Sequence, residues 1–554
     1  MRGDLEWGTI PRLVQAAADR HGDAEAVAGP RTRISYRQLG ERVRRAAAAV
    51  MAAGVRPGER VAVWAPNTPD FVVAALGAVS AGAVLVPLGT RLKAAEVLDL
   101  LRRTRACTLF VTDTFLGVSY VSALRAAGSG AGGSGAGGSD AGASGARRGK
   151  AVGPFPGLPH LRTAVVLGDR TEAREGFQHW RGFLAAGADV PDRAVRARID
   201  AVRGEDPADM MFTSGTTGLP KGAVTTHAQS LRAFSTWADL AGLAEGDRYL
   251  VVNPFTHTFG YKAGILASLM RGATILPLPV FEAEAVLAAV STERVTVLPG
   301  APTVYQSLLD HPGRAGYDLG SLRLAVTGAA VVPLELVTRI REELGFDTVI
   351  TAYGLTEACG LVTMGRRGDD PGLIAATSGR AVPGVELRIA DESGTGLPCG
   401  TPGEVQVRGY NVMREYFEDP QATAAAVTAD GWLHTGDIGI VDDSGNLRIT
   451  DRLGDMFTVG GFNAYPAEIE RVLIRHPLVA DCAVVGIPDP RLGEVGKAYV
   501  VPHGAPEPGA AEALIAWARR EMANYKVPRQ VAFLGELPRN ASGKVLKRQL
   551  RAGG

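Results

Sequence analysis

Cysteine is scarce in this chain. Its 554 residues include four cysteines, at positions 107, 359, 399 and 482, and no two of them have the spacing of a CxxC pair. This scarcity excludes a disulfide framework or a cysteine-based zinc site as the basis of the fold. Dispersed thiols are typical of a reducing compartment, so we expect a cytoplasmic protein.

An excess of charge of either sign is also missing. The chain has 59 basic and 58 acidic residues, so neither nucleic acid nor an anionic membrane is expected as a partner. Residues 71–89 are uncharged and long enough to span a bilayer, but Gly77, Ser80, Gly82 and Pro87 interrupt them. We interpret this stretch as a buried helix followed by a buried strand, and we expect no integral membrane segment. The sequence leaves the oligomeric state, including a homodimer, open.

Lysine is scarce as well, since only eight of the 59 basic residues are lysines. Two of the eight, Lys221 and Lys544, stand in the most informative segments of the chain. Residues 211–222 read Met-Phe-Thr-Ser-Gly-Thr-Thr-Gly-Leu-Pro-Lys-Gly, and residues 537–547 read Leu-Pro-Arg-Asn-Ala-Ser-Gly-Lys-Val-Leu-Lys.

The first of these segments has the composition of a phosphate-binding loop. Its glycines allow backbone N–H groups to approach anionic oxygens, its hydroxyls add donors, and Lys221 supplies charge. It is not a Walker loop, because Gly222 stands where that motif has Ser or Thr after the lysine. An ordinary kinase or GTPase is therefore disfavoured, and a flexible surface turn is the alternative for the segment taken alone.

Helical and strand patterns alternate along most of the chain, which predicts an α/β fold of layered subdomains. Helices are expected at residues 10–20 and 36–53. Strands are expected at residues 61–64, 84–88, 108–112, 163–167, 248–253, 273–278, 296–299, 322–327 and 348–352, and residues 384–437 predict a small β-rich subdomain.

Two composition changes divide the chain. Residues from about 126 to 157 are rich in Gly, Ala and Ser, and cannot bury enough apolar area to offset the entropy of ordering, so we expect a disordered insertion there. Near residue 451 a Gly-containing segment predicts a bend. We therefore expect an N-terminal domain over residues 1–450 and a small, mobile C-terminal α+β domain over residues 451–554.

These motifs together resemble the adenylate-forming superfamily of acyl-CoA synthetases, peptide-synthetase adenylation domains and luciferases. The resemblance covers almost the whole chain outside the insertion. It implies that the loop handles the β- and γ-phosphates of ATP, and that Glu357, with Thr216, holds Mg²⁺. The residues that it assigns to nucleotide or cofactor binding are Thr213, Ser214, Gly215, Thr216, Thr217, Gly218, Lys221, Gly328, Ala329, Tyr353, Gly354, Asp437, Arg452, Gly460 and Gly461.

The resemblance also implies catalytic residues. Lys544 would reach the acyl carboxylate and the α-phosphate during adenylation, Thr356 would bond the α-phosphate, and His257 would lie beside the carboxylate. A histidine that only shapes the pocket is an equal alternative for His257, and no general base is required, because a carboxylate is already ionised at neutral pH. His227 is expected to be structural, in the helix that follows the loop.

At the hinge the chain departs from the family pattern. Gly454 stands where the family usually has Asp or Lys, which leaves rotation feasible but removes a side chain that could favour one conformer. Residues 460–466, Gly-Gly-Phe-Asn-Ala-Tyr-Pro, match the segment that flanks the pantetheine tunnel in the family.

The resemblance implies an ATP-dependent acid–CoA ligase that uses ATP, Mg²⁺ and coenzyme A. A carboxylic acid would form an acyl-adenylate with release of pyrophosphate, and coenzyme A would then take the acyl group with release of AMP. Two alternatives stay open: an adenylation enzyme that loads a carrier-protein pantetheine, and a catalytically silent nucleotide sensor.

For the acid, the residues around Lys262 are similar to those of actinobacterial ligases that act on the indanone-propionate left by steroid ring degradation. Medium-chain and aryl-alkanoic acids are the alternatives. Lys262 would contact a keto group of such a bicyclic acid, or it would be a helix-end charge facing solvent.

The two opening segments generate a prediction for Lys544→Ala. Attack of one anion on another needs charge neutralisation, so this variant should lose adenylation about a hundredfold or more. Thioester formation from supplied acyl-adenylate should survive, because the lysine is then withdrawn. Rates of ATP–pyrophosphate exchange and of thioester formation measure the two steps, and an equal loss of both would contradict the assignment.

Overall fold

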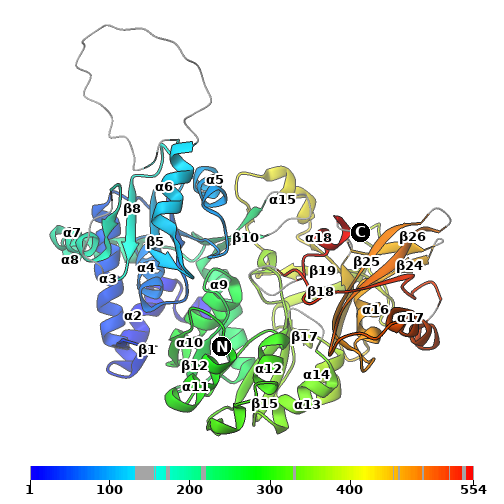
Figure 1. The fold of residues 1–554 in the computed structure, drawn as a ribbon. Helices are drawn as coiled ribbons and strands as arrows, with labels where there is room; N and C mark the ends of the chain where they lie inside the picture. Colours follow the sequence, from blue (N-terminus) through cyan, green and yellow to red (C-terminus); the bar gives the residue numbers. More distant parts are fainter. Residues whose placement is uncertain are drawn as a thin grey trace. The chain divides into compact units, whose positions relative to one another are not determined.

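The computed structural model describes residues 2–130, 155, 157–169, 175–213, 220–328, 332–452, 455–459, 462–489, 492–522, 524–539 and 545–552 (Figure 1). The chain forms two compact units. Unit 1 comprises Met1–Pro299, Ala315–Leu324 and Met413–Thr423, and unit 2 comprises Gly300–Arg314, Ala325–Val412 and Ala424–Gly554.

Unit 1 is built on an eight-stranded sheet in the order β20-β11-β10-β4-β3-β5-β8-β9. The strands from β10 to β9 run parallel, and β11 and β20 are antiparallel to their neighbours. In sheet order the bounds are β20 (Glu415–Tyr416), β11 (Lys221–Thr226), β10 (Pro207–Thr213), β4 (Val84–Pro87), β3 (Arg60–Trp64), β5 (Thr108–Thr112), β8 (Thr163–Leu167) and β9 (Gln178–His179).

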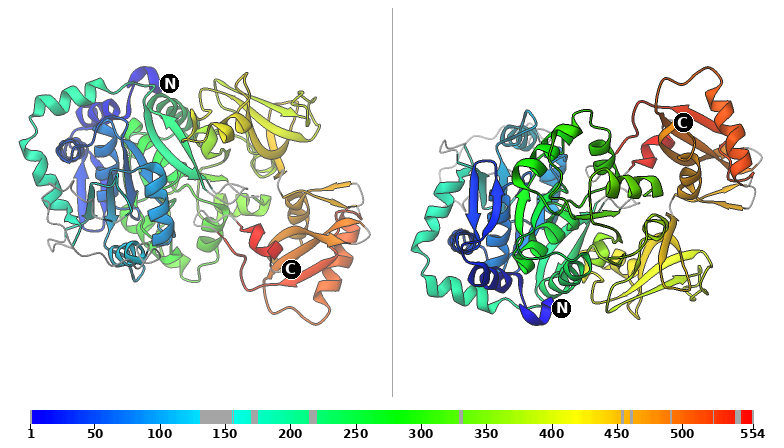
Figure 2. Two further views of the ribbon diagram at one scale, coloured as in Figure 1. Left: turned by 90° about the horizontal axis from the view of Figure 1, so that it is seen from above. Right: turned by 90° about the horizontal axis from the view of Figure 1, so that it is seen from below.

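Helices cover both faces of this sheet (Figures 1 and 2). Side chains alternate along β5, so Leu109 and Val111 join a core with α5 and α6, whereas the Phe110 ring packs edge-on against Trp180 and Phe183 of α7. The helices of unit 1 are α1 (Gly3–Glu6), α2 (Ile10–His21), α3 (Tyr36–Ala52), α4 (Pro69–Ser80), α5 (Ala94–Thr104), α6 (Tyr120–Gly130), α7 (Trp180–Ala186), α8 (Asp192–Ala201), α9 (His227–Ala241), α10 (Ala267–Arg271) and α11 (Ala283–Glu293).

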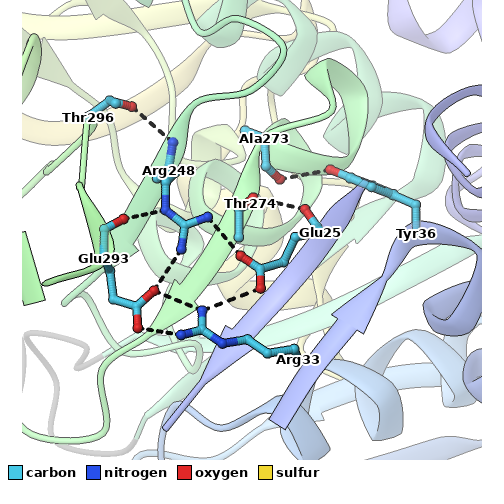
Figure 3. A network of polar contacts seen from close by, with 8 residues as sticks. All are labelled: Glu25, Arg33, Tyr36, Arg248, Ala273, Thr274, Glu293 and Thr296. Carbon is cyan, nitrogen blue, oxygen red and sulfur yellow. Dashed lines mark hydrogen bonds and ion pairs between the residues drawn. The ribbon is translucent and has the colours of Figure 1, made fainter. Parts of the chain in front are cut away.

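A second sheet of unit 1 has the order β12-β13-β1-β2, with β12 (Arg248–Val251), β13 (Thr274–Pro277), β1 (Glu25–Gly29) and β2 (Thr32–Ser35). A network of ion pairs joins its strands to the end of α11 (Figure 3). The Arg248 guanidinium contacts Glu25 and Glu293 at 2.7 Å each, and Arg33 contacts Glu293 at 2.5 Å. The hydrogen bond from Arg33 lowers the pKa of the Glu293 carboxyl, so this network stays charged at neutral pH.

Unit 2 contains three further sheets. One has the order β14-β15-β16-β17 and one has the order β18-β19-β21-β22. Their bounds are β14 (Leu324–Gly328), β15 (Thr348–Tyr353), β16 (Thr363–Met364), β17 (Arg380–Ala381), β18 (Val385–Ala390), β19 (Gly403–Gly409), β21 (Leu433–Val441) and β22 (Leu447–Arg452), with helices α12 (Pro302–Leu309), α13 (Leu334–Glu342) and α14 (Pro371–Ala376).

The third sheet is C-terminal and carries its own core. Its strands are β23 (Phe457–Val459), β24 (Phe462–Ala464), β25 (Val479–Asp489), β26 (Gly493–Pro502) and β27 (Gln530–Phe533). Side chains of α16 (Pro466–Leu473) and α17 (Ala510–Glu521) pack with Val484 and Val500, whereas Leu550 of α18 (Lys547–Ala552) packs with Val485 and Tyr499. Because residues 484 and 485 alternate along β25, the helices cover opposite faces of the sheet.

The fold confirms the α/β prediction and most of the predicted strands. Residues 71–89 form most of α4 and all of β4, which are buried as expected. The strand predicted at 296–299 is wrong, because Val297 makes only isolated bridges to Tyr249 and Leu324. Helix α6 continues to Gly130, so the predicted disordered insertion overlaps this helix, and its residues 131–154 lie outside the described part. No helix among the described residues is long and apolar enough to cross a membrane.

His227 is structural, as predicted. It begins α9, only 1% of its surface is exposed, and its Nδ1 accepts a hydrogen bond from the backbone N–H of Ile10 at 3.3 Å. Burial lowers the pKa of His227 from 6.5 to about 4. The buried imidazole is therefore neutral at neutral pH.

This burial predicts a pH dependence of stability. Between pH 6.5 and about 4 the unfolded chain binds a proton at this histidine and the folded chain does not. The stabilisation is complete above pH 6.5, and up to about 3 kcal/mol is lost as the pH falls towards 4. His227→Gln should therefore show a shallower fall of thermal midpoint between pH 7 and 5 than the parent chain. His503→Gln, at an exposed position, is the control, and parallel curves for the parent and His227→Gln would contradict the prediction.

Candidate active site

The two strands that flank the phosphate loop stay paired up to the residues that border the loop. Strands β10 and β11 form an antiparallel hairpin whose last pair is Thr213 opposite Lys221. The loop therefore leaves and re-enters the sheet at adjacent points. Its expected phosphate-binding residues Ser214, Gly215, Thr216, Thr217 and Gly218 lie outside the described part, so their contacts stay predictions.

The Lys221 side chain is placed by a strand from much later in the chain. Its Nζ lies 5.2 Å from the centroid of the Tyr416 ring, and Tyr416 is on β20, which pairs with β11. A cation over an aromatic face is stabilised electrostatically. The contact places the Lys221 ammonium group at the edge of the loop.

Arg103 contacts residues at both ends of this loop, and no sequence pattern indicates this function. Its guanidinium donates a hydrogen bond to the carbonyl of Pro220 at 2.6 Å and lies 5.9 Å from the centroid of the Phe212 ring. One side chain of α5 thus contacts the residues on both sides of the loop. Arg103 lies among several arginines on an amphipathic helix, so its sequence carries no signal of this role.

The segment with His257 is fixed by a buried asparagine. The Asn67 side-chain amide donates to the carbonyls of Val251 and Asn253 at 3.0 and 2.9 Å, and its Oδ1 accepts from the N–H of Phe255 at 2.8 Å. Gly260 closes the turn, since a Cβ there would lie 2.1 Å from the carbonyl oxygen of Pro254. Neither the contacts of Asn67 nor the packing of Gly260 has a signal in the local sequence.

His257 itself is neutral. Burial lowers its pKa, and its Nε2 is buried without a hydrogen-bond partner among the described residues. A buried ring nitrogen without a partner costs free energy unless a ligand or water meets it. A lowered pKa also makes the imidazole a weaker base, which agrees with a reaction that requires none. Both expected functions, contact with the acid and shaping of the pocket, remain predictions.

In unit 2 the structure brings Tyr353 and Asp437 together. The Tyr353 hydroxyl, at the end of β15, donates to Asp437 Oδ2 at 2.6 Å. Asp437 is 5% exposed on β21, and the backbone of Arg452 on β22 is its partner in the antiparallel register. Three residues that were predicted from distant motifs are thus neighbours in the structure.

The turn before Asp437 is held by polar contacts that the sequence analysis missed. The Glu404 carboxylate contacts His434 Nδ1 at 2.7 Å and accepts from the N–H of Gly436 at 3.2 Å. The Thr435 hydroxyl donates to the carbonyl of Val405 and accepts from the N–H of Asp437. These bonds fix the direction in which Asp437 presents its carboxylate.

Two predicted glycines are required by close packing. A Cβ at Gly328 would lie 2.3 Å from the carbonyl oxygen of Ala352, and one at Gly354 would lie 2.2 Å from that of Gly360. Any side chain would separate the end of β14 from β15, or β15 from the turn after it. Ala329, next to Gly328, lies outside the described part.

Thr356 and Glu357 begin the short 3₁₀ helix η4 (Thr356–Ala358), which is separated from the end of β15 by two residues. The described residues contain no cluster of three or more His, Cys, Asp or Glu side chains that could hold a metal ion alone. One carboxylate fits Mg²⁺ that arrives with a nucleotide, because this ion takes one or two carboxylates and completes its shell with phosphate oxygens and water. Glu357 would hold the ion, and the ion would neutralise phosphate charge.

The remaining predicted residues lie outside the described part: Lys544, Gly454, Gly460 and Gly461. Beside the segment of Lys544, Arg539 and Val545 form an antiparallel bridge, Arg539 is paired with Asp481, and Lys547 contacts Glu470 at 2.8 Å. The residues before and after Lys544 are therefore anchored to the C-terminal sheet and to α16.

The sequence matches known proteins over nearly its whole length. Residues 14–417 match the AMP-binding enzyme family, and residues 468–544 match the AMP-binding enzyme C-terminal domain. The chain therefore belongs to the AMP-binding enzyme family.

Two curated relatives make this likeness more specific. The chain is 48% identical over 547 residues to the 3-[(3aS,4S,7aS)-7a-methyl-1,5-dioxo-octahydro-1H-inden-4-yl]propanoyl:CoA ligase of Rhodococcus jostii, and 49% identical over 544 residues to the ligase of the same name from Mycobacterium tuberculosis. Each alignment covers 98% of both chains. The chain is therefore an ATP-dependent, AMP-forming acid–CoA ligase.

Solved structures agree with this family. The anthranilate CoA ligase AuaEII, in complex with anthranoyl-AMP, superimposes with a TM-score of 0.83 at 27% identity, and the alignment covers 99% of this chain and 97% of that one. ATP-bound MatB from Rhodopseudomonas palustris gives a TM-score of 0.80 at 26% identity, with 98% and 99% of the two chains covered.

The contact between Tyr353 and Asp437 predicts the effect of Tyr353→Phe. Without the hydroxyl, Asp437 loses a hydrogen bond that orients it. The free energy of ATP binding should weaken by about 1 kcal/mol, which corresponds to about a fivefold rise in KM for ATP. The KM for the acid should change less than twofold. Steady-state kinetics measure both.

Tyr499→Phe is the matched control, because it removes a hydroxyl that donates at 2.8 Å to the carbonyl of Leu550 in the C-terminal core. It should lower the thermal midpoint and leave the KM for ATP unchanged. An unchanged KM for ATP in Tyr353→Phe would show that the hydroxyl does not orient Asp437 for the nucleotide.

Proposed function

We propose that this enzyme activates a bicyclic keto-propionate, the indanone-propionate type of acid named in its two relatives. The observation that carries the proposal is an identity of 48–49% sustained over 98% of both chains in each alignment. Feruloyl-CoA synthase of Amycolatopsis is 37% identical, and bovine medium-chain acyl-CoA ligase is 32% identical. Those lower values favour the bicyclic acid over aryl and medium-chain acids.

In the first half-reaction a carboxylate oxygen attacks the α-phosphorus of ATP and pyrophosphate leaves. Lys221 and the loop amides stabilise the negative charge that accumulates on pyrophosphate, while Thr356 bonds the α-phosphate. Asp437, aimed by the Tyr353 hydroxyl, accepts hydrogen bonds from the ribose hydroxyls. Lys544 neutralises charge between the two anions.

In the second half-reaction the coenzyme A thiol, as thiolate, attacks the acyl carbon and AMP leaves with the electron pair of the broken C–O bond. Rotation of the C-terminal domain, from about residue 451, would withdraw Lys544 and bring Gly460 and Gly461 to the pantetheine. The separate core of the C-terminal sheet supports a domain that moves as one body. Gly454 would serve as the pivot.

The four cysteines are free thiols, three of them buried, which supports a cytoplasmic location.

Mg²⁺ would enter with the nucleotide, and Glu357 would then hold the ion.

A panel of acids tests the substrate assignment. The enzyme is supplied with ATP, Mg²⁺ and coenzyme A, and AMP release is measured with the bicyclic keto-propionate, octanoate, ferulate and anthranilate. We expect kcat/KM for the bicyclic acid to exceed each other value at least tenfold, which corresponds to about 1.4 kcal/mol of transition-state binding. A higher value for octanoate or ferulate would overturn the substrate and leave the reaction class intact.

A further inference from the structure

Lys262 is buried, and this excludes the solvent-facing interpretation. It is 0% exposed in the π-helix η2 (Phe259–Leu266). Its Nζ lies 3.1 Å from Asp209 Oδ1 and donates to the Thr225 hydroxyl at 2.7 Å. The Thr225 hydroxyl donates in turn to Asp209 Oδ1 at 2.8 Å, so each of the three side chains contacts the other two, and the three are here named the buried tie. The Ser230 hydroxyl also donates to Asp209 Oδ2 at 3.5 Å.

The buried tie joins two segments that serve different substrates. Asp209 and Thr225 are cross-strand partners in the β10–β11 hairpin, which carries the phosphate loop at its end. Lys262 belongs to the helix that begins two residues after His257, the residue expected beside the acid. The buried tie therefore connects the hairpin that carries the phosphate loop to the helix that follows His257.

The geometry of the hairpin makes this connection direct. Successive strand residues point to opposite faces, so Asp209 and Thr225 project from the same face as Thr213 and Lys221, the last pair before the loop. Four residues along β10 correspond to about 13 Å. The ion pair thus lies on the same face of the hairpin as Thr213 and Lys221, the last residues before and after the loop.

The π-helix is itself fixed on its other side. A Cβ at Gly264 would lie 2.8 Å from the Val251 side chain, and one at Gly260 would overlap Pro254. The helix therefore packs closely against β12 and the turn that leads to His257, with no room for a side chain at Gly260 or Gly264. π-Helical turns are rare and frequently occur at functional sites.

Hydrophobic packing alone would be enough to join these elements. Burial of two charges is costly unless they are paired and hydrogen-bonded, and apolar residues of the same volume are often at least as stabilising. The buried tie is therefore weak evidence for added stability. An ion pair does supply directional contacts at fixed distances, which positioning requires.

We propose that Lys262 is a positioning residue that sets the phosphate loop against the acid-binding segment for the adenylation step. The inference rests on the proposed function, since it assumes that the loop holds ATP and that the segment of His257 holds the acid. Pyrophosphate leaves after the first half-reaction, so the hairpin position matters for adenylation and much less for thioester formation.

The test compares Lys262→Met with the double variant Lys262→Met/Asp209→Asn. Two rates are measured for each: ATP–pyrophosphate exchange with the acid that the parent enzyme prefers, and thioester formation from supplied acyl-adenylate and coenzyme A. The double variant leaves no charge buried without a partner, so it keeps the test decisive if the single variant fails to fold. We expect exchange to fall at least tenfold in the double variant and thioester formation to fall less than threefold.

Glu293→Gln is the matched control. It weakens an ion-pair network of the same unit that joins β12 to α11 (Figure 3). It should lower the thermal midpoint and leave the ratio of the two rates unchanged. Lys262→Arg should recover part of the exchange rate, since it keeps the charge and changes the geometry.

Three outcomes would overturn the inference. A proportional fall of both rates would make Lys262 a structural residue. Unchanged exchange would show that the hairpin needs no such contact. A rise in KM restricted to keto acids, with normal exchange for acids that lack the keto group, would make Lys262 a substrate-contacting residue. If the parent enzyme gave no exchange with any acid, the proposed function would fail instead.

Discussion

The pairing of β10 with β11 is the constraint on which the rest of the site depends. The two ends of the phosphate loop are positioned by the register that places Thr213 opposite Lys221. Arg103, Tyr416 and the buried tie all contact this hairpin. These contacts come from three separate parts of the chain, and together they fix the two strands that flank the phosphate loop.

Much of the scaffold could be predicted from the sequence because its signals are local. The strands at residues 108–112 and 163–167 have the predicted bounds, since runs of buried β-branched and apolar residues are specific to parallel sheets. The helices predicted at 10–20 and 36–53 end within one residue of the observed ones, because apolar residues recur along them with the period of an amphipathic helix. Of the site, the family resemblance named Lys221, Tyr353 and Asp437, and the structure places the last two in contact.

What could not be predicted depends on contacts between residues far apart in the chain. Asn67 binds a turn almost two hundred residues later, and no local pattern separates it from any other polar residue near a strand end. The π-helix has the same apolar composition as an α-helix, so periodicity cannot distinguish them. Lys262 stood out as a rare residue, but its partner Asp209 is identified only by the fold.

Strand β20 has a consequence for biosynthesis. It completes the eight-stranded sheet beside the phosphate loop, yet it is translated about 190 residues after β11. Until residue 416 has emerged from the ribosome, β11 is an open edge strand with unpaired N–H and C=O groups. The nascent chain must therefore keep this edge from pairing elsewhere for about 10–40 seconds of translation at 5–20 residues per second.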